Sequence, residues 1–305
     1  MEKLVELGSQ LEREFGEGRY PLSFISEKRP ELYGRVKKAN IEYDEQDLQD
    51  LALALTIRDS RAPVIKRAFI GALISNLTES RMNHNKRAIV KLDMNNMEFP
   101  YLCYGTKYAD RLEICNVKGD FIGSGIASCN GKARKIHISN IEGNFAGARI
   151  ISNCGSAGII KIENIMGDYA GIYMGDFGSR AGLISINNLI GRGLYYNIVS
   201  KKGRAGIISY RKTFPCSVIL TDALSVGMGE TPIIFSLDLP QAVLKNMPGG
   251  KSFLSYIEKE RENFGILDFK GMYHDRINEF TDRLENNAQG YISAEDVFLS
   301  LCCVA

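Results

Sequence analysis

The sequence predicts a mainly β protein: a parallel β-helix (β-solenoid) with α-helical caps at its N-terminal and C-terminal ends. Three observations support this prediction. A block of 24 residues recurs four times without gaps, apolar residues within each block alternate with polar ones, and the blocks hold 17 of the 30 glycines but no proline. Stacked coils share one core and an unbroken ladder of backbone hydrogen bonds, which excludes proline.

The repeat places like residues at like positions. Its first position is asparagine in every block, at Asn116, Asn140, Asn164 and Asn188. The fourth position is always glycine, and the sixth is aromatic in the first three blocks, as at Phe121. Because adjacent coils lie about 4.8 Å apart, each block position becomes a column along the solenoid. We expect column one to be a ladder of asparagine amides, column six an aromatic stack, and columns four and eight turns that require glycine.

Strand signals lie in the second half of each block. Ile160 and Ile162 alternate with polar neighbours, which is the period-two pattern of a strand with one buried face. We expect two or three short strands in each coil. Ala109 and Ile114 keep the same phase ahead of the first block and predict a degenerate first coil, whereas the phase is lost after Lys212. One or two irregular closing coils should follow, for about five or six coils in all.

Both flanks are predicted to be helical, which divides the chain into a helical region over residues 1–85, a parallel β-helix over 86–235 and a second helical region over 236–305. Leu4 and Leu11 share one face of the first helix. Further helices are expected over residues 44–55, 63–77, 239–247, 252–263, 274–285 and 294–301. A solenoid exposes an apolar cross-section at each end, so we interpret the helices as caps.

Composition narrows the class of protein. No apolar run approaches the roughly 18 residues of a membrane span, and the first residues form a charged amphipathic helix, which predicts a cytoplasmic protein. The net charge of +2 hides a basic centre, since residues 110–212 hold fourteen Lys and Arg against seven Asp and Glu.

None of the seven cysteines forms a C-x-x-C pair, and no histidine has the spacing of a metal site or a triad. We expect buried free thiols, no metal and no cofactor.

The glycine spacing resembles that of a known fold. Asn140, Gly143 and Gly147 match the pattern G-x-x-G-x-x-x-G with asparagine in first place, and the blocks on either side repeat the match. The pattern is similar to the Gly-rich β-helix found in formylmethanofuran dehydrogenase, where it forms one of the polypeptides of the enzyme, and in the C-terminal domain of the large chain of glutamate synthase. The resemblance covers roughly residues 90–212. It implies a packing module whose host enzymes carry their active sites elsewhere, and no catalytic residue carries over.

Column five offers two carboxylates, Asp120 and Asp168, with Asn144 between them. Two strand spacings separate the aspartates by about 9.6 Å, near the upper end of the range for the acid and base of an inverting glycoside hydrolase. Parallel β-helices also host polysaccharide-degrading enzymes, so a glycan-active enzyme is one alternative. An aspartate directly after a turn glycine is equally ordinary turn chemistry, and the chain has no tryptophan to stack on a sugar.

Basic residues gather at another edge of the predicted solenoid. Column seventeen contains Lys132, Arg180 and Arg204, and further cations lie close by in the sequence at Arg134, Lys135, Lys201 and Lys202. Such a basic strip can bind the phosphates of a nucleic acid or an acidic protein face. Long charged side chains at stacked turns also prevent lateral pairing of an edge, so a solvated surface is the alternative.

Two segments near the C-terminus weakly match known motifs, a calcium-binding loop and a prenylation signal. Residues 285–296 fit a calcium-binding EF-hand loop with Gly290 at its centre, but Asp296 stands where a bidentate glutamate is needed. We interpret Gly290 as the end of one helix and Ser293 as the N-cap of the next. The final Cys-Cys-Val-Ala has the form of a prenylation signal on Cys302, but no polybasic segment precedes it, and we expect no membrane anchor.

These observations predict a non-catalytic scaffold or protein–protein interaction module in a larger assembly, with another protein as its partner. Two alternatives stay open. One is a glycan-active enzyme that uses Asp120 and Asp168 as acid and base; the other binds a polyanion or nucleic acid through the basic strip. The resemblance to non-catalytic packing modules favours the scaffold.

Overall fold

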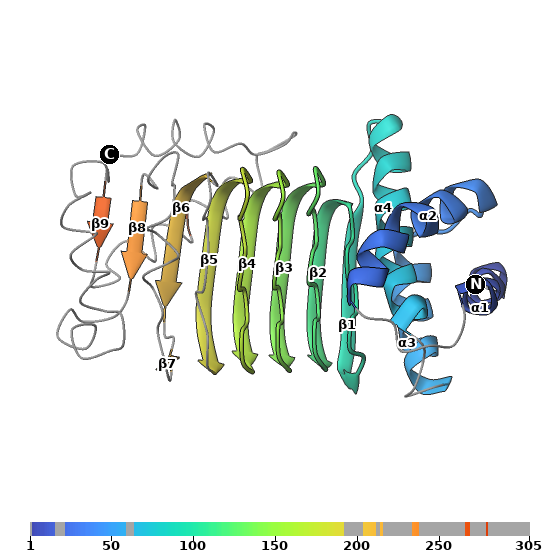
Figure 1. The fold of residues 1–305 in the computed structure, drawn as a ribbon, viewed down its shortest axis with the longest axis horizontal. Coiled ribbons are helices and arrows are strands. Elements are labelled where there is room, and N and C mark those ends of the chain that lie inside the picture. Colours follow the sequence, from blue (N-terminus) through green and yellow to red (C-terminus); the bar gives the residue numbers. More distant parts are fainter. Residues whose placement is uncertain are drawn as a thin grey trace.

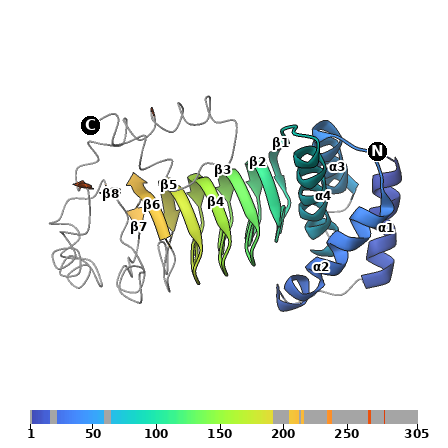
Figure 2. The same cartoon turned by 90° about the horizontal axis from the view of Figure 1, so that it is seen from above.

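The computed structural model describes residues 2–15, 22–58, 64–191, 204–211, 214–215, 234–237 and 266–268, together with Glu279. In this part of the chain, helices precede a stack of parallel strands (Figure 1). The helices lie at one end of the stack, next to its first strands, and the strands follow one another along a single axis (Figure 2).

The strands form one parallel sheet whose spatial order follows the sequence, except that β7 pairs with β5. The long strands are β1 Ile89–Glu98, β2 Tyr108–Lys118, β3 Lys132–Glu142, β4 Ser156–Met166 and β5 Arg180–Gly191. Shorter strands follow at β6 Arg204–Arg211, β7 Phe214–Pro215, β8 Ile234–Leu237 and β9 Ile266–Asp268. Each long strand pairs with the next, so β1 to β5 make about four turns of a parallel β-solenoid. The predicted fold class is confirmed.

The 24-residue phase of the sequence is the register of the sheet. Ala109 pairs with Ala133, and the same alanine column continues to Ala205. The first coil is degenerate, as predicted, because Ile89 pairs with Arg111, a step of 22 residues. Equivalent positions of successive blocks are therefore neighbours in space, and a contact between coils repeats at every turn.

Two inward-facing columns lie in the core of the solenoid. Columns twenty-one and twenty-three are fully buried, at Leu112, Ile136, Ile160 and Ile184 and at Ile114, Ile138, Ile162 and Ile186. Burial of one such side chain stabilises the fold by about 1.5–3 kcal/mol. A single coil would leave these side chains open above and below, so the core exists only in the stack.

Glycine is required in column four because neighbouring coils approach too closely for a side chain. A Cβ on Gly143 would lie 2.0 Å from the carbonyl oxygen of Gly119, and a Cβ on Gly167 would lie 2.0 Å from that of Gly143. Column eight requires glycine for a different reason, since Gly147 has a φ of +64°, where side chains are strained. Both glycine predictions are confirmed.

The connection after each long strand is a run of turns. A positive φ recurs at every second residue, at Phe121, Gly123, Gly125 and Ala127. Backbone N–H groups in this run bond alternately to the next coil and to the previous one, as from Phe121 to the carbonyl of Asn144 and from Gly123 to that of Leu102, both at 2.8 Å. The expectation of two or three strands per coil is therefore wrong for the coils from β2 to β5. Each has one long strand, and turns supply the remaining contacts between coils.

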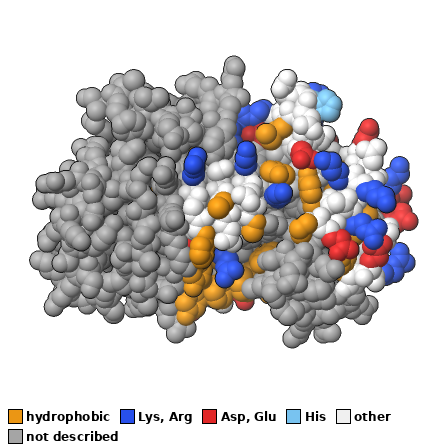
Figure 3. Space-filling view, turned by 45° about the horizontal axis from the view of Figure 1, so that its top comes forward, with side chains coloured by type: hydrophobic (Ala, Val, Ile, Leu, Met, Phe, Trp, Pro, Cys, Tyr) orange, Lys and Arg blue, Asp and Glu red, His pale blue; other side chains and the backbone are white. Residues whose placement is uncertain are grey.

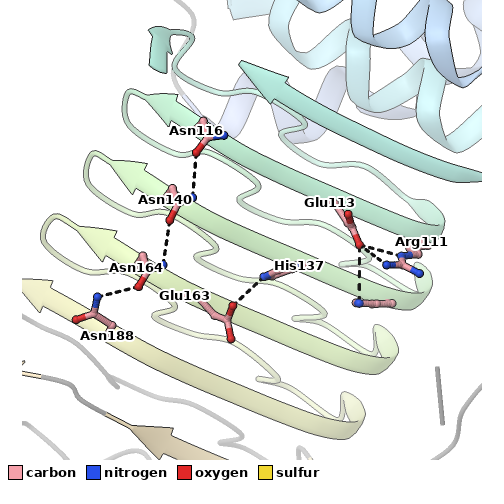
Figure 4. A network of polar contacts seen from close by, with 9 residues as sticks. Arg111, Glu113, Asn116, His137, Asn140, Glu163, Asn164 and Asn188 are labelled. Carbon is pink, nitrogen blue, oxygen red and sulfur yellow. Dashed lines mark hydrogen bonds and ion pairs between the residues drawn. The ribbon is translucent and has the colours of Figure 1, made fainter. Parts of the chain in front are cut away.

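Column one is the predicted asparagine ladder (Figure 4). The Nδ2 of each asparagine donates to the Oδ1 of the one before it, over 2.9 Å from Asn140 to Asn116, 3.0 Å from Asn164 to Asn140 and 2.8 Å from Asn188 to Asn164. At the N-terminal end, Asn116 donates to the Oδ1 of Asp93 at 2.9 Å. The four asparagines have φ values from 53° to 55°, so the same residue also suits a left-handed corner in the strand.

Column six is the predicted aromatic stack. The ring centroids of Phe121 and Phe145 lie 4.7 Å apart with planes 1° from parallel, and Tyr169 continues the stack at 5.1 Å. Tyr101 extends it into the degenerate first coil, at 5.1 Å from Phe121.

The N-terminal flank is helical, with α1 Glu2–Phe15, α2 Leu22–Ala39, α3 Glu45–Arg58 and α4 Val64–Asn83. The sequence pattern predicts α1, α3 and α4 but misses α2. Pro30 lies inside α2. A proline removes one helical hydrogen bond and commonly ends a helix, so the pattern around it does not indicate a helix of this length.

Side chains of the helices take the place of a neighbouring strand at the edge of the first coil. Gln49 in α3 donates to the carbonyl of Asp93 at 2.7 Å and accepts the N–H of Asp93 at 2.9 Å. Ser75 in α4 accepts the N–H of Lys107 at 2.8 Å and that of Tyr108 at 3.3 Å. These bonds satisfy backbone groups that an edge strand leaves open, so α3 and α4 cap the solenoid.

Apart from Glu279, which is helical, the predicted C-terminal helices, the loop over residues 285–296 and the final four residues lie outside the described residues. Strand β9 lies between two of the segments predicted to be helical. Among the described helices, none combines the length and the apolar character that a membrane crossing needs.

Candidate functional site

Column five holds the two candidate carboxylates, and its side chains bond to the backbone of the next coil. The Oδ1 of Asp120 accepts the N–H of Asn144 at 2.8 Å, and the Oδ1 of Asn144 accepts the N–H of Asp168 at 2.9 Å. All three residues are half-buried. The column is thus a second ladder, which runs from side chain to backbone and uses aspartate and asparagine as turn residues.

Column seventeen brings together part of the predicted basic strip. Lys132 and Arg180 occupy it two coils apart, and both are exposed. Arg204 pairs with Arg180, but only its backbone is described. Lys201 and Lys202 lie outside the described residues.

The other two cations proposed for the strip are buried. Arg134 Nε lies 3.0 Å from the Oδ1 of Asp110, and Lys135 Nζ lies 3.8 Å from the Oε1 of Glu113, with the two basic side chains 9% and 6% exposed. Burial lowers the pKa of the Arg134 guanidinium, and the charge of Asp110 opposes this change. Arg134 and Lys135 do not continue the exposed surface of Lys132, because carboxylates of the preceding coil hold them.

Asp110 is the centre of the more deeply buried charge cluster. Its Oδ2 accepts a hydrogen bond from the Nε of Arg87 and, at 3.1 Å, the N–H of Ala88, while its Oδ1 faces Arg134. The sequence reasoning missed this residue. A detectable signal is the opposite charge at the same block position one coil later, as in Asp110 and Arg134.

A second charge cluster lies on the outer face of β2 to β4 (Figure 4). Arg111 donates to the Oε1 of Glu113 from Nε at 2.9 Å and from Nη2 at 2.6 Å, and His137 Nε2 lies 3.1 Å from the Oε2 of Glu163. Burial raises the pKa of Glu113, but the hydrogen bond and charge of Arg111 outweigh it and hold that pKa below its ordinary value. The cluster pairs Glu113 with Arg111 along one strand and Glu163 with His137 between coils.

A cavity of about 550 Å³ lies between the ends of α2 and α4. Tyr33 Oη and Lys37 Nζ both donate to the Oε2 of Glu79 at 2.7 Å, and the Oη of Tyr43 accepts from Asn76 at 3.0 Å. The hydrogen bonds from Lys37 and Tyr33 hold the pKa of Glu79 below its ordinary value, and burial raises the pKa of Tyr43 to about 12. Four polar residues of the wall, Lys37, Glu79, Tyr43 and Asn76, are thus engaged in hydrogen bonds.

The cysteines differ in exposure. Cys103 is buried and Cys115 half-buried, whereas Cys129 and Cys154 are exposed. The expectation of buried thiols is therefore wrong for Cys129 and Cys154, which lie on an outward-facing corner after β2 and β3. Within the described ranges, no group of three or more His, Cys, Asp or Glu is placed to hold a metal ion.

The geometry defines a class, the parallel β-solenoid with a helical N-terminal cap, whose polar columns bond one coil to the next. No family model, curated protein or solved structure matches the chain.

Proposed function

We propose that the chain is a non-catalytic scaffold or protein–protein interaction module within a larger assembly. The observation that carries the proposal is an exposed apolar corner, formed by Met166, Tyr169 and Ile190. Met166 pairs in register with Ile190, and the three side chains are 59%, 44% and 45% exposed. The two preceding coils have an ion pair in the same column, Lys118 with Glu142 at 2.7 Å, so the column changes from charged to apolar along the solenoid.

Three physical arguments support a protein partner. Exposed apolar side chains that gather at one place typically mark a protein interface. The corner is built on paired strands and on a turn bonded to neighbouring coils, so little ordering entropy is lost on binding. Of the two carboxylates that suggest catalysis, Asp120 and Asp168, the side chain of Asp120 already bonds to the next coil. The resemblance to the packing module of formylmethanofuran dehydrogenase and glutamate synthase points in the same direction.

The test compares the complexes formed by matched variants at native expression level. We expect the tagged wild-type chain to elute in an assembly larger than the chain alone, and the double variant Met166→Glu, Ile190→Glu to elute as the free chain. The control is Met82→Glu, because Met82 is 61% exposed but lies on the helical cap. This control should keep the assembly. A wild-type chain that elutes at its own mass would refute the proposal.

A second candidate function, polyanion binding, is favoured by the exposure of Lys132 and Arg180 in one column. Figure 3 shows basic side chains dispersed over the described coils, with hydrophobic ones between them. Each phosphate contact contributes about 0.7–0.9 to the slope of log affinity against log salt. We expect Lys132→Glu with Arg180→Glu to weaken RNA or heparin binding and reduce this slope by about 1–2, and Lys38→Glu on the cap to leave it unchanged. Binding that is insensitive to salt would exclude this function.

A further inference from the structure

Cys129 and Cys154 lie on successive coils at the same outward-facing corner. Cys129 donates its N–H to the carbonyl of Ser152 at 2.9 Å, and the next residue, Asn130, donates to that of Asn153 at 3.1 Å. These two bonds place Cys129 opposite Asn153, one residue before Cys154. The cysteines are thus diagonal neighbours across one coil-to-coil step.

The Cα–Cα distance along this diagonal is that of a disulfide-bonded pair. One coil spacing is about 4.8 Å and one step along the chain about 3.8 Å, which puts the two Cα atoms about 6 Å apart. Disulfides join Cα atoms about 4.4–6.8 Å apart. The Cα atoms of the two cysteines therefore lie within this range.

The side chains can reach each other by rotation of one of them. The Nδ2 of Asn153 lies 4.0 Å from the Sγ of Cys129, so the Cys129 thiol already faces the coil of Cys154. The thiol of Cys154 points to the following coil, where it donates to the carbonyl of Phe177 at 3.4 Å. Because Cys154 is exposed, its χ1 can change without displacing packed neighbours.

The other two described cysteines are poor competitors. Burial raises the pKa of the Cys103 thiol. Burial and the charge of Asp93 raise the pKa of Cys115 as well. Since the thiolate is the reactive form, both react slowly with oxidants. The structure thus separates two exposed thiols on adjacent coils from two that are shielded.

We propose that Cys129 and Cys154 are a site of oxidation by hydroperoxides, which convert the two thiols to a reversible disulfide that joins two successive coils. One cysteine attacks the peroxide oxygen and becomes a sulfenic acid, while the peroxide is reduced to water or to the corresponding alcohol. The second thiol attacks the sulfenic sulfur, the S–S bond forms and water leaves. The two thiols supply the two electrons, and a thiol reductant restores them by exchange.

The site differs from the proposed interface and does not depend on it. A disulfide here closes a loop that contains the whole of β3. Coils of a solenoid separate one after another as it unfolds, so a covalent link between neighbours opposes that process. Oxidation should stabilise the stack, and a reductant should reverse the effect.

The test uses the full chain with Cys216, Cys302 and Cys303 replaced by serine, because these three lie outside the described residues. Treatment with hydrogen peroxide should remove two hydrogen atoms from the intact mass and link the peptides that contain Cys129 and Cys154. The thermal midpoint should rise by about 5–10 °C and return on reduction. Cys115→Ser should leave all three results unchanged, and Cys154→Ser should give a trappable sulfenic acid on Cys129.

Two outcomes overturn the proposal: disulfides between separate chains without the internal link, or a link that involves Cys103 or Cys115. If the triple serine background does not fold, peptide mapping of the oxidised wild-type chain decides the same question. A map in which Cys129 and Cys154 stay reduced, or are overoxidised without pairing, would refute it.

Discussion

The asparagine ladder gives the sharpest test of the fold, because each asparagine has two separable tasks. Asn164 donates to Asn140 and accepts from Asn188, and it holds a left-handed corner with a φ of 54°. Asn164→Gly removes the amide but keeps the corner, whereas Asn164→Ala removes the amide and strains the corner. Asn188→Ala strains an equivalent corner but removes one described bond in place of two.

The magnitudes follow from exposure and conformation. The ladder asparagines Asn140 and Asn164 are exposed, so each amide bond contributes at the low end of the usual range, about 0.5 kcal/mol. A left-handed conformation costs alanine about 1 kcal/mol more than glycine. We therefore expect a loss of about 2 kcal/mol for Asn164→Ala, about 1 kcal/mol for Asn164→Gly and about 1.5 kcal/mol for Asn188→Ala.

The assay is urea unfolding followed by circular dichroism and by tyrosine fluorescence, since coincident transitions justify a two-state treatment. The slope of free energy against urea should stay the same in all variants, so that differences in midpoint report stability. Equal midpoints for Asn164→Ala and Asn164→Gly would show that the corner imposes no conformational cost. A smaller loss for Asn164→Ala than for Asn188→Ala would show that the amides do not form a ladder.

Three further predictions concern the coil spacing, the ladder end and the cap. Gly167→Ala should cost at least about 3 kcal/mol in urea unfolding, because a Cβ would lie 2.0 Å from a carbonyl oxygen of the preceding coil. The control Gly34→Ala, with no atom within 4 Å of its Cβ, should stabilise the exposed helix by about 0.5–1 kcal/mol; equal effects would contradict the close packing. The hydrogen bond from the Asn116 amide holds the pKa of Asp93 below its ordinary value. The stability that this bond contributes is therefore present above the ordinary carboxyl pKa and is lost as the pH falls through the lowered pKa of Asp93. Urea midpoints measured across the acid range should show a loss that Asp93→Asn reduces, and an unchanged profile would argue against it. Gln49→Ala should cost about 1–2 kcal/mol through two lost bonds to the first strand, whereas Gln46→Ala on the same helix should cost less, and equal urea midpoints would contradict the capping role.

The regular part of the solenoid could be predicted because residues at the same position of successive blocks contact one another on adjacent coils. Asn140 and Asn164 are neighbours because one coil is 24 residues long. Gly167 must be glycine because the backbones of equivalent positions approach closely. The turn run was not predictable in the same way. Residues such as Phe121 and Ala127 adopt a left-handed conformation that their side chains disfavour, and only the bonds between coils hold them there.

In the candidate sites, too, some features follow from the repeat and others depend on contacts between coils. The column of Lys132 and Arg180 is an exposed edge, as the spacing predicts, but Arg134 and Lys135 turn away from it. Their burial depends on carboxylates of the preceding coil, Asp110 among them, and on the packing around those carboxylates. A count of charges along the chain treats all four cations as surface residues.

The sequence by itself determined the class of fold, the period, the ladder and the glycine columns, because translation by one coil maps each block onto the next and leaves a periodic signal. Only the tertiary structure decided which polar groups are engaged, which thiols are exposed and how the cap meets the first strand. The contact of Gln49 with Asp93 joins positions that no period relates, and the exposure of the Cys129 and Cys154 thiols does not follow from the period either. Such contacts depend on side-chain direction and burial, which appear only once the coils are stacked.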